Sequence, residues 1–436
     1  MKHLFITFCW LGISLSFGQN HQIIDTSDYE QRKILVKSFE EKHELFNKQL
    51  KNDYKGPLRR ELLNFYEYSQ SSVLQIITNK KILFDKRYQN YIDSLYTEIE
   101  ASNPLLQNVD IKVLISKNTS PNALSIGDGT LILNIGLFSF LENEYQLQSV
   151  ITHELGHQLL EHTKNNIEER AKISVGQLST KSALFKSLNR DKYNQGERSF
   201  NLLKDLLYKQ GELKRRQEIE ADSLGYVLFK NTNAPKSQFI GALHMLKKFD
   251  SVPEIVIDSM TYKKLFDIPE QKFKKSWLVN ENFDNYNYEL YHDKINLDSL
   301  ESHPEIDIRI SSLENSFLEL QNLEKSEYSP SNTFSKLQNL ARQAYVENLF
   351  YLNEYGLSIY LSMKRLEEES DDSYYKKWLG INFNAIYEAK KKYQLNRYVD
   401  RLVPNKQSES YQKFINFIWN LDLNEIKVIA DHYNLP

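Results

Sequence analysis

The stretch VITHELGHQLLEHT, residues 150–163, places three histidines and two glutamates within ten positions. Apolar residues recur around it at the spacing of one helix face, which predicts a helix running from Gly136 through His162. That face is formed by Leu147, Val150, Ile151, Leu155, Leu159 and Leu160. The stretch is therefore predicted to lie inside a buried helix.

Two of the histidines have the spacing of metal ligands. His153 and His157 are four residues apart, so on a helix both side chains project from nearly the same side and can reach one ion. Glu154 would then lie beside the next coordination position, where a carboxylate can take a proton from a metal-bound water. An accidental match in an ordinary helix is the alternative, but these groups would be costly to bury without a metal. The HExxH pattern thus predicts a zinc hydrolase.

The third ligand does not come from the same stretch. His162 lies five residues beyond His157, about 140° around a continuous helix, and so would point away from the ion. We therefore expect Glu161 and His162 to be surface residues. A metzincin site would need glycine and histidine where this chain has Leu160 and Thr163, so that class is excluded.

A second helical stretch, from about Ser199 to Phe229, contains the sequence QEIEAD at 217–222. Glu218 and Asp222 are four residues apart, so one carboxylate can bind the metal while the other accepts the N–H of a ligating imidazole. Glu220 points roughly 200° away from Glu218 and is the poorer choice. We predict that His153, His157 and Glu218 hold one zinc ion per chain, with Asp222 behind a histidine. A solvated helix face is the alternative.

The rest of the chain predicts a mainly α protein with a small β-sheet (α+β). Glycine and proline are scarce, at 14 and 10 of 436 residues, which favours long helices. Strand patterns occur only between residues 110 and 135, in IKVLIS, NALSI and TLILNI, the last two joined by a turn at Asp128-Gly129. The net charge of −3 argues against a nucleic-acid partner.

The ends of the chain indicate export and several domains. Residues 1–18, MKHLFITFCWLGISLSFG, have the pattern of a signal peptide, which predicts a periplasmic or extracellular protein whose mature chain does not span a membrane. The polar segment 164–198 is expected to form short helices or a mobile flap. The sequence NLEKSEYSPSNT at 322–333 resembles a linker, so we expect a domain boundary there. The expected units are a helical segment 19–79, a metallopeptidase domain 80–320 and a helical, repeat-like accessory domain 334–436.

HELGH followed some sixty residues later by ExEAD resembles the gluzincin family of HtpX-like and CAAX prenyl-protein endopeptidases, in its soluble, exported branch. The resemblance covers about residues 80–315 in compatible order. It includes Asn122-Ala123 on a strand, Gly136-Leu137 at a helix start, the acids Glu142 and Glu144 before the zinc helix, and SHPEIDIRI at 302–310.

The resemblance implies a zincin-like domain with zinc on His153, His157 and Glu218, and Glu154 as general base. It also implies that His303 or Arg309 reaches the site, to stabilise an oxyanion or to occupy the fourth zinc position. A histidine-proline pair that merely ends a loop is the alternative reading.

The strand at Asn122 and Ala123 would pair with an extended polypeptide substrate. The expected function is therefore a zinc endopeptidase acting on unfolded or misassembled envelope proteins. The alternative is a chaperone-like protein with a closed zinc site, which binds a protein partner through residues 334–433.

Overall fold

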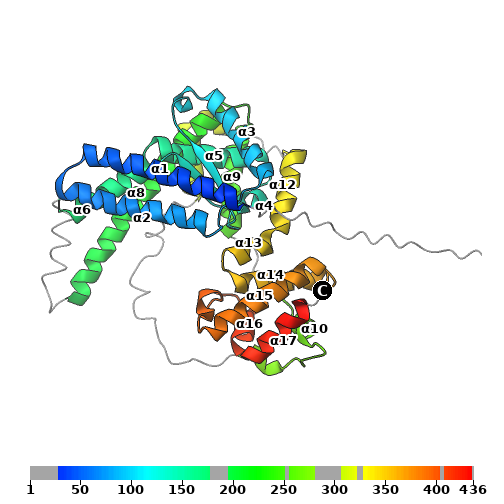
Figure 1. Cartoon of the computed structure of the whole chain (residues 1–436). Helices are drawn as coiled ribbons and strands as arrows, with labels where there is room; N and C mark the ends of the chain where they lie inside the picture. Colours follow the sequence, from blue (N-terminus) through cyan, green and yellow to red (C-terminus); the bar gives the residue numbers. More distant parts are fainter. Residues whose placement is uncertain are drawn as a thin grey trace, which may run out of the picture.

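The computed structural model shows a mainly helical protein with one small sheet, as the sequence predicts (Figure 1). It describes residues 28–176, 195–250, 255–279, 306–321, 328–402 and 407–434. The expected signal peptide and His303 lie outside these residues. None of the described helices is both long enough and apolar enough to cross a membrane.

The sheet has three strands in the order β1-β3-β2. β1 runs parallel to β3, and β2 runs antiparallel to β3 as the partner of a tight hairpin. Gly129 has a φ of +87°, and a Cβ there would lie 2.2 Å from the carbonyl oxygen of Asp110, so the turn needs glycine. The predicted strands and turn are confirmed, and β2 is an edge strand. The bounds are Lys112–Ser116 for β1, Ala123–Ser125 for β2 and Thr130–Asn134 for β3.

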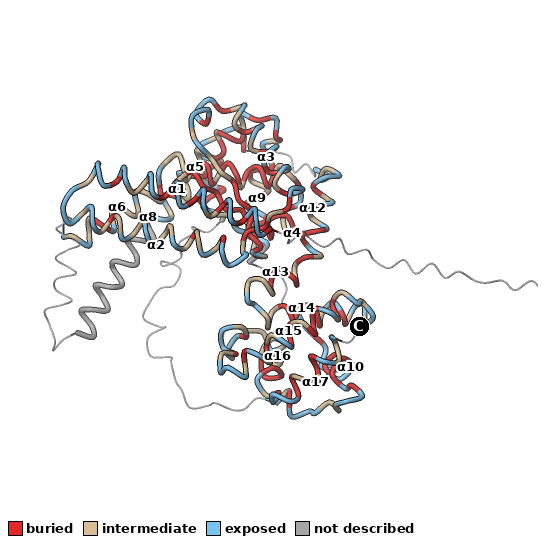
Figure 2. The backbone as a smooth tube through the Cα atoms, in the orientation of Figure 1, coloured by how far each residue is buried: buried red, intermediate tan, exposed pale blue. Residues whose placement is uncertain are grey.

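The described residues form two lobes, and the first of them contains the sheet (Figure 1). Helix α5 lies at the centre of this first lobe, where buried residues concentrate (Figure 2). Leu147, Ile151 and Leu155 pack with the sheet residues Leu131 and Leu133 in one apolar cluster. α8 and α9 both pack along α5, and side chains of α8, α9 and α11 meet in a second apolar cluster. These elements are α3 (Lys86–Ser102), α4 (Gly136–Phe140), α5 (Glu144–Leu159), α8 (Gln195–Lys230), α9 (Ser237–Asp250) and α11 (Ile306–Ser316).

The expected continuous helix from Gly136 through His162 is wrong. α4 ends at Phe140. The Asn143 side chain then caps α5 by accepting hydrogen bonds from the backbone N–H groups of Tyr145 and Gln146. α5 ends at Leu159, because Glu161 adopts a left-handed conformation with a φ of 52°. A new helix, α6 (His162–Ser174), begins directly after it.

The N-terminal helices α1 (Tyr29–Asp53) and α2 (Gly56–Thr78) pack against each other, and α6 lies against α2. The Tyr54 hydroxyl donates to Glu168 Oε1 at 2.6 Å and so fastens α6 to the end of α1. The segment 164–198 is expected to form short helices or a mobile flap; its beginning is a docked helix, and its last residues, 195–198, belong to α8. Residues 177–194 lie outside the described residues.

A second lobe contains most of the C-terminal helices, with α13 between the lobes (Figure 1). Its core joins α14 to α17 with α10 and Trp277, whereas Phe334 and Leu337 of α12 pack in the core of the first lobe. Packing therefore crosses the expected boundary at 320–334, and the division into domains stays a prediction. The helices are α10 (Ser259–Phe266), α12 (Asn332–Gln343), α13 (Tyr345–Tyr351), α14 (Tyr355–Glu368), α15 (Ser373–Lys391), α16 (Glu409–Asn420) and α17 (Leu423–Asn434). Short 3-10 turns are η1 (Pro104–Leu106), η2 (Lys275–Leu278), η4 (Leu318–Leu320) and η5 (Leu395–Arg397).

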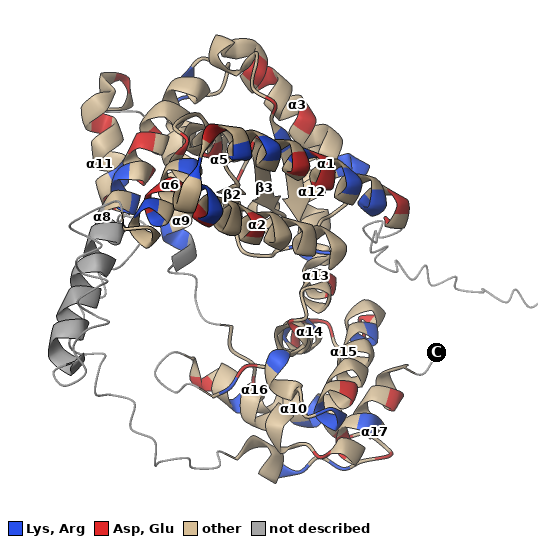
Figure 3. Ribbon diagram, turned by 60° about the vertical axis from the view of Figure 1, so that its left-hand side comes forward, with Lys and Arg blue, Asp and Glu red and all other residues tan. Residues whose placement is uncertain are grey.

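Charged residues of both signs share the helix surfaces, for example along α1 and α17 (Figure 3). Such mixing is typical of solvated faces. The absence of a nucleic-acid partner stays a prediction.

Candidate metal centre

His153 and His157 of α5 meet Glu218 of α8 at one point. The two histidine Nε2 atoms are 3.1 Å apart; Glu218 Oε2 lies 3.5 Å from Nε2 of His153, and Glu218 Oε1 lies 3.5 Å from Nε2 of His157. Ligand atoms bound at about 2.1 Å to a tetrahedral ion lie about 3.4 Å from one another. The three side chains therefore have the spacing and the chemistry of a zinc site with one position open.

Two glycines allow the helices to come close enough for this contact. A Cβ on Gly156 of α5 would lie 2.6 Å from the carbonyl oxygen of Ala221, and one on Gly225 of α8 would lie 2.9 Å from the Cα of His153. A side chain at either position would push the helix axes apart and carry Glu218 away from the histidines. Periodicity alone gives no sign of this requirement.

The second nitrogen of His153 faces buried charges. Its Nδ1 lies 2.8 Å from Asp222 Oδ1, and Asp222 is only 1% exposed. Arg309 of α11 donates from Nε and Nη2 to the two oxygens of Asp222, at 2.7 and 2.6 Å. Its Nη1 lies 3.5 Å from Glu218 Oε2. Arg309 thus holds both carboxylates from behind the site, which favours a positioning role over contact with an oxyanion.

The charges of Asp222, Glu218 and Arg309 together favour a cation at the ligand atoms. Burial disfavours ionised Asp222, but the Arg309 guanidinium and His153 outweigh it and hold the pKa of Asp222 below its ordinary value. Burial likewise disfavours a proton on His153, but Asp222 and Glu218 raise the pKa of His153 to about 10. The same carboxylates that hold this proton would stabilise a divalent ion in its place.

Glu154 lies in the same cleft and is 8% exposed. Burial raises its pKa above the ordinary value, although the neighbouring His153 and His157 oppose that rise. A carboxyl group with a raised pKa in a cleft suits a general base.

The cleft has a volume of about 560 Å³ and is bordered by β2, α5, α8, α9 and α11. Asn122 and Ala123 lie on its rim, at the edge strand. The Asn122 carbonyl accepts from Asn134 of β3 at 3.0 Å, so the next residue turns its backbone toward the outer edge. The Ala123 N–H donates to Oδ1 of the Asn122 side chain at 2.9 Å. Pairing of this edge with a substrate stays a prediction.

His162 is the residue that sequence reasoning misplaced. It is 5% exposed, and its Nδ1 lies 2.9 Å from Nδ1 of His157. The expectation of a surface side chain is wrong because the helix ends before His162, so the angle computed for a continuous helix does not apply. Burial, followed by the charge of His157, lowers the pKa of His162. Glu161 is exposed, as expected.

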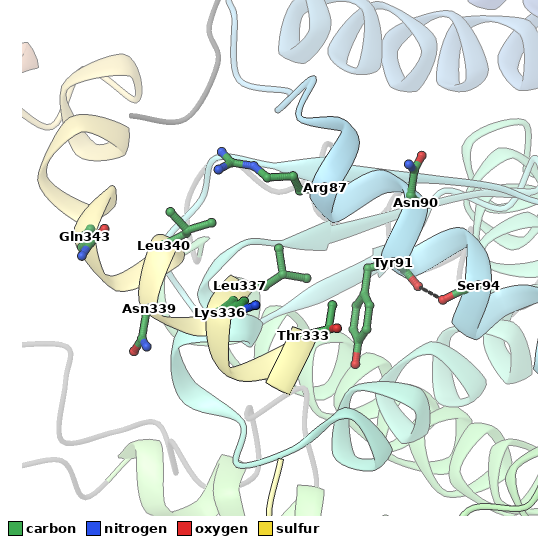
Figure 4. A pocket seen from close by; sticks show the side chains of 10 residues that line it. All are labelled: Arg87, Asn90, Tyr91, Ser94, Thr333, Lys336, Leu337, Asn339, Leu340 and Gln343. Carbon is green, nitrogen blue, oxygen red and sulfur yellow. Dashed lines mark hydrogen bonds between the residues drawn. The ribbon is translucent and has the colours of Figure 1, made fainter. Parts of the chain in front are cut away.

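Several other hollows of the described residues lie away from the metal centre, and two of them adjoin the first lobe. One, of about 730 Å³, lies where α12 crosses α3 and is lined mainly by amides, hydroxyls, Arg87 and Lys336 (Figure 4). The other, of about 1000 Å³, lies between the lobes and is lined largely by apolar side chains. Neither is lined by a residue of the metal centre.

Comparison with known proteins agrees with this site. The family model of Peptidase family M48 matches residues 85–316, just over half of the chain. The chain therefore belongs to this family of peptidases, and the resemblance seen in the sequence is confirmed. It is also similar to the beta-barrel assembly-enhancing protease of Yersinia pestis, with 26% identity over 102 residues. That match covers 23% of this chain and 21% of the relative.

Proposed function

We propose that this member of peptidase family M48 is a zinc-dependent endopeptidase that hydrolyses peptide bonds in unfolded or misassembled envelope proteins. The observation that carries the proposal is the convergence of His153, His157 and Glu218 around one point beside Glu154. Family membership supports the coarser statement that the chain is a metallopeptidase acting on polypeptides.

The side chains divide the chemistry in a definite way. His153, His157 and Glu218 would hold the ion, which supplies Lewis acidity and lowers the pKa of its water toward ~7. Glu154 takes the proton of the attacking water on its carboxylate and passes it to the leaving amide nitrogen. Arg309 and Asp222 keep the ligands oriented during this exchange.

The cleft suits a polypeptide held in extended form. The outer edge of β2 borders it, and the exposed Leu124 side chain and the apolar Leu243 and Leu246 offer contacts to substrate side chains. We propose that Asn122 and Ala123 pair with the substrate backbone. His303 is retained as a candidate for the oxyanion or the open metal position.

The setting outside the cytoplasm rests on two supports. The N-terminal sequence has a signal-peptide pattern. The similar protein of Yersinia pestis is named for enhancing β-barrel assembly, which is a property of that protein. Misassembled envelope proteins are accordingly the proposed substrates.

The Glu154→Gln variant tests the reaction. We expect cleavage of casein and of an unfolded model polypeptide to fall by at least about 1000-fold, because the general base is lost while the ligands stay. Elemental analysis should still find one zinc ion per chain, and circular dichroism should show an unchanged fold. Retained cleavage at the wild-type rate would overturn the proposal.

A partner-binding role of the second lobe is the second candidate, and the hollow between the lobes favours it. Leu357 and Leu361 of α14 line this hollow together with Phe140 of the first lobe. Truncation near residue 320 is a poor test, because it removes Phe334 and Leu337 from the core of the first lobe.

Leu357→Arg changes this hollow without truncation, and it should leave cleavage of a short peptide within about threefold of wild type. If Leu357→Arg abolishes the prevention of aggregation by the chain while Glu154→Gln preserves it, the partner-binding role is supported. The endopeptidase proposal requires the opposite result, in which Glu154→Gln abolishes the prevention of aggregation and Leu357→Arg preserves it.

A further inference from the structure

The two ligating imidazoles of the centre have different neighbours on their outer sides. His157 turns Nε2 toward Glu218 and His153, and turns Nδ1 toward Nδ1 of His162 at 2.9 Å. The other nitrogen of His162, Nε2, lies 3.3 Å from Glu220 Oε2. The contacts therefore form a line from the metal position through two imidazoles to a carboxylate.

This line fixes where the protons must lie when His157 binds a metal. A neutral imidazole that offers the lone pair of Nε2 carries its proton on Nδ1. That N–H of His157 then donates to the unprotonated Nδ1 of His162. The proton of His162 consequently lies on Nε2 and is directed at the acceptor Glu220. Each contact determines the tautomer of the next ring.

The backbone holds His162 in this position. The left-handed Glu161 ends α5, so His162 opens α6 and its ring lies 5.0 Å from the ring of His157, at 74°. α6 is fastened to α8 by a reciprocal amide pair between Asn166 and Gln217, with both bonds 3.0 Å long. Gln217 directly precedes Glu218 in α8, so the same element supplies a metal ligand and the end of the line.

We propose that His162, backed by Glu220, is a positioning residue that fixes the tautomer and ring orientation of His157 for metal binding. This inference rests on the proposed zinc centre. His162 would do for His157 what Asp222, held by Arg309, does for His153. An outer partner of this kind is typically worth about 10- to 100-fold in metal affinity.

The first experiment measures the zinc dissociation constant of the purified full chain by competition with a chromophoric chelator. His162→Leu removes both contacts, and we expect about 10- to 100-fold weaker binding. His162→Gln can accept from His157 through Oε1 and donate to Glu220 through Nε2, so it should restore affinity to within about threefold of wild type. His244→Gln is the matched control, because His244 is an exposed residue of α9, and its affinity should be unchanged.

The second experiment observes the rings directly and does not depend on tolerance of a substitution. Long-range proton–nitrogen spectra of the zinc-loaded protein with labelled histidine should show a proton on Nδ1 of His157 and on Nε2 of His162. A proton on Nδ1 of His162 would overturn the proposal. So would wild-type affinity in His162→Leu, or two zinc ions per wild-type chain, because Nδ1 of His157 would then serve a second ion.

These outcomes separate the inference from the proposed function. If Glu154→Gln keeps full cleavage, the endopeptidase mechanism fails, yet the zinc affinities still report on His162. If the affinities are equal while Glu154→Gln is inactive, the mechanism stands and the role of His162 is wrong.

Discussion

The two sides of the candidate metal centre differ in how they support a histidine. Behind His153 lie Asp222 and Arg309, at 1% and 5% exposure, joined by two hydrogen bonds of 2.6 and 2.7 Å. Behind His157 lies the imidazole of His162, and the carboxylate that follows it, Glu220, has a side chain 47% exposed. One side is a buried ion pair, and the other is a line of contacts that ends in solvent.

From this difference we infer that folding depends on the side behind His153, whereas the side behind His157 affects mainly the metal affinity. A buried charge that loses its partner is strongly destabilising, because no water replaces the lost contact. A half-exposed carboxylate loses little, because water solvates it in either case. We therefore expect changes behind His153 to affect folding and metal affinity together, and changes behind His157 to affect mainly the metal.

The largest effect is expected from Arg309→Met. The substitution removes the buried guanidinium that pairs with both Asp222 and Glu218, and we expect the free energy of unfolding of the metal-free chain to fall by about 3–5 kcal/mol. Urea denaturation at neutral pH measures this change. Arg365→Met is the matched control, since Arg365 forms an exposed pair with Glu368 that is worth at most about 1 kcal/mol. Equal losses in the two variants would show that burial does not distinguish these arginines.

A smaller effect, of about 10- to 100-fold in zinc affinity, is expected from Asp222→Asn. The amide can still accept from His153, but it no longer contributes a charge beside the ion. Glu220→Gln should weaken zinc less than tenfold, because its carboxylate is half-exposed and one imidazole farther from the metal. Chelator competition on both variants ranks the two sides, and a larger loss in Glu220→Gln would reverse the comparison.

The difference between the sides also explains what the sequence could predict. The positions of His153, His157, Glu218 and Asp222 follow from helix geometry, because each pair lies four residues apart inside a regular helix. The predicted hairpin followed from Asp128-Gly129 in the same local way. Such features depend on residues close together in the chain, where periodicity carries the information.

His162 could not be predicted in this way. Its position depends on a left-handed Glu161, a conformation that a non-glycine residue adopts only when surrounding contacts hold it. Those contacts, such as the Asn166–Gln217 amide pair, join residues far apart in the chain. The position of Arg309 depends in the same way on α11 packing against α8.

The smallest effect is a dependence of zinc affinity on pH, set by the buried side. Asp222 and Glu218 raise the pKa of His153 to about 10 in the metal-free fold, above its ordinary 6.5. The protonated ring stabilises this fold fully below about pH 6.5, and the contribution is lost as pH rises through about 10. Zinc needs the unprotonated ring, so binding in this window releases a proton, and affinity should rise about tenfold per pH unit.

Zinc competition at three pH values between 6.5 and 8.5 measures this slope. Asp222→Asn should flatten it, because the amide no longer favours the proton on His153, whereas Glu220→Gln should leave it steep. Parallel slopes in wild type and Asp222→Asn would mean that the released proton does not come from His153. The buried side would then stabilise the fold without governing competition between the proton and the metal.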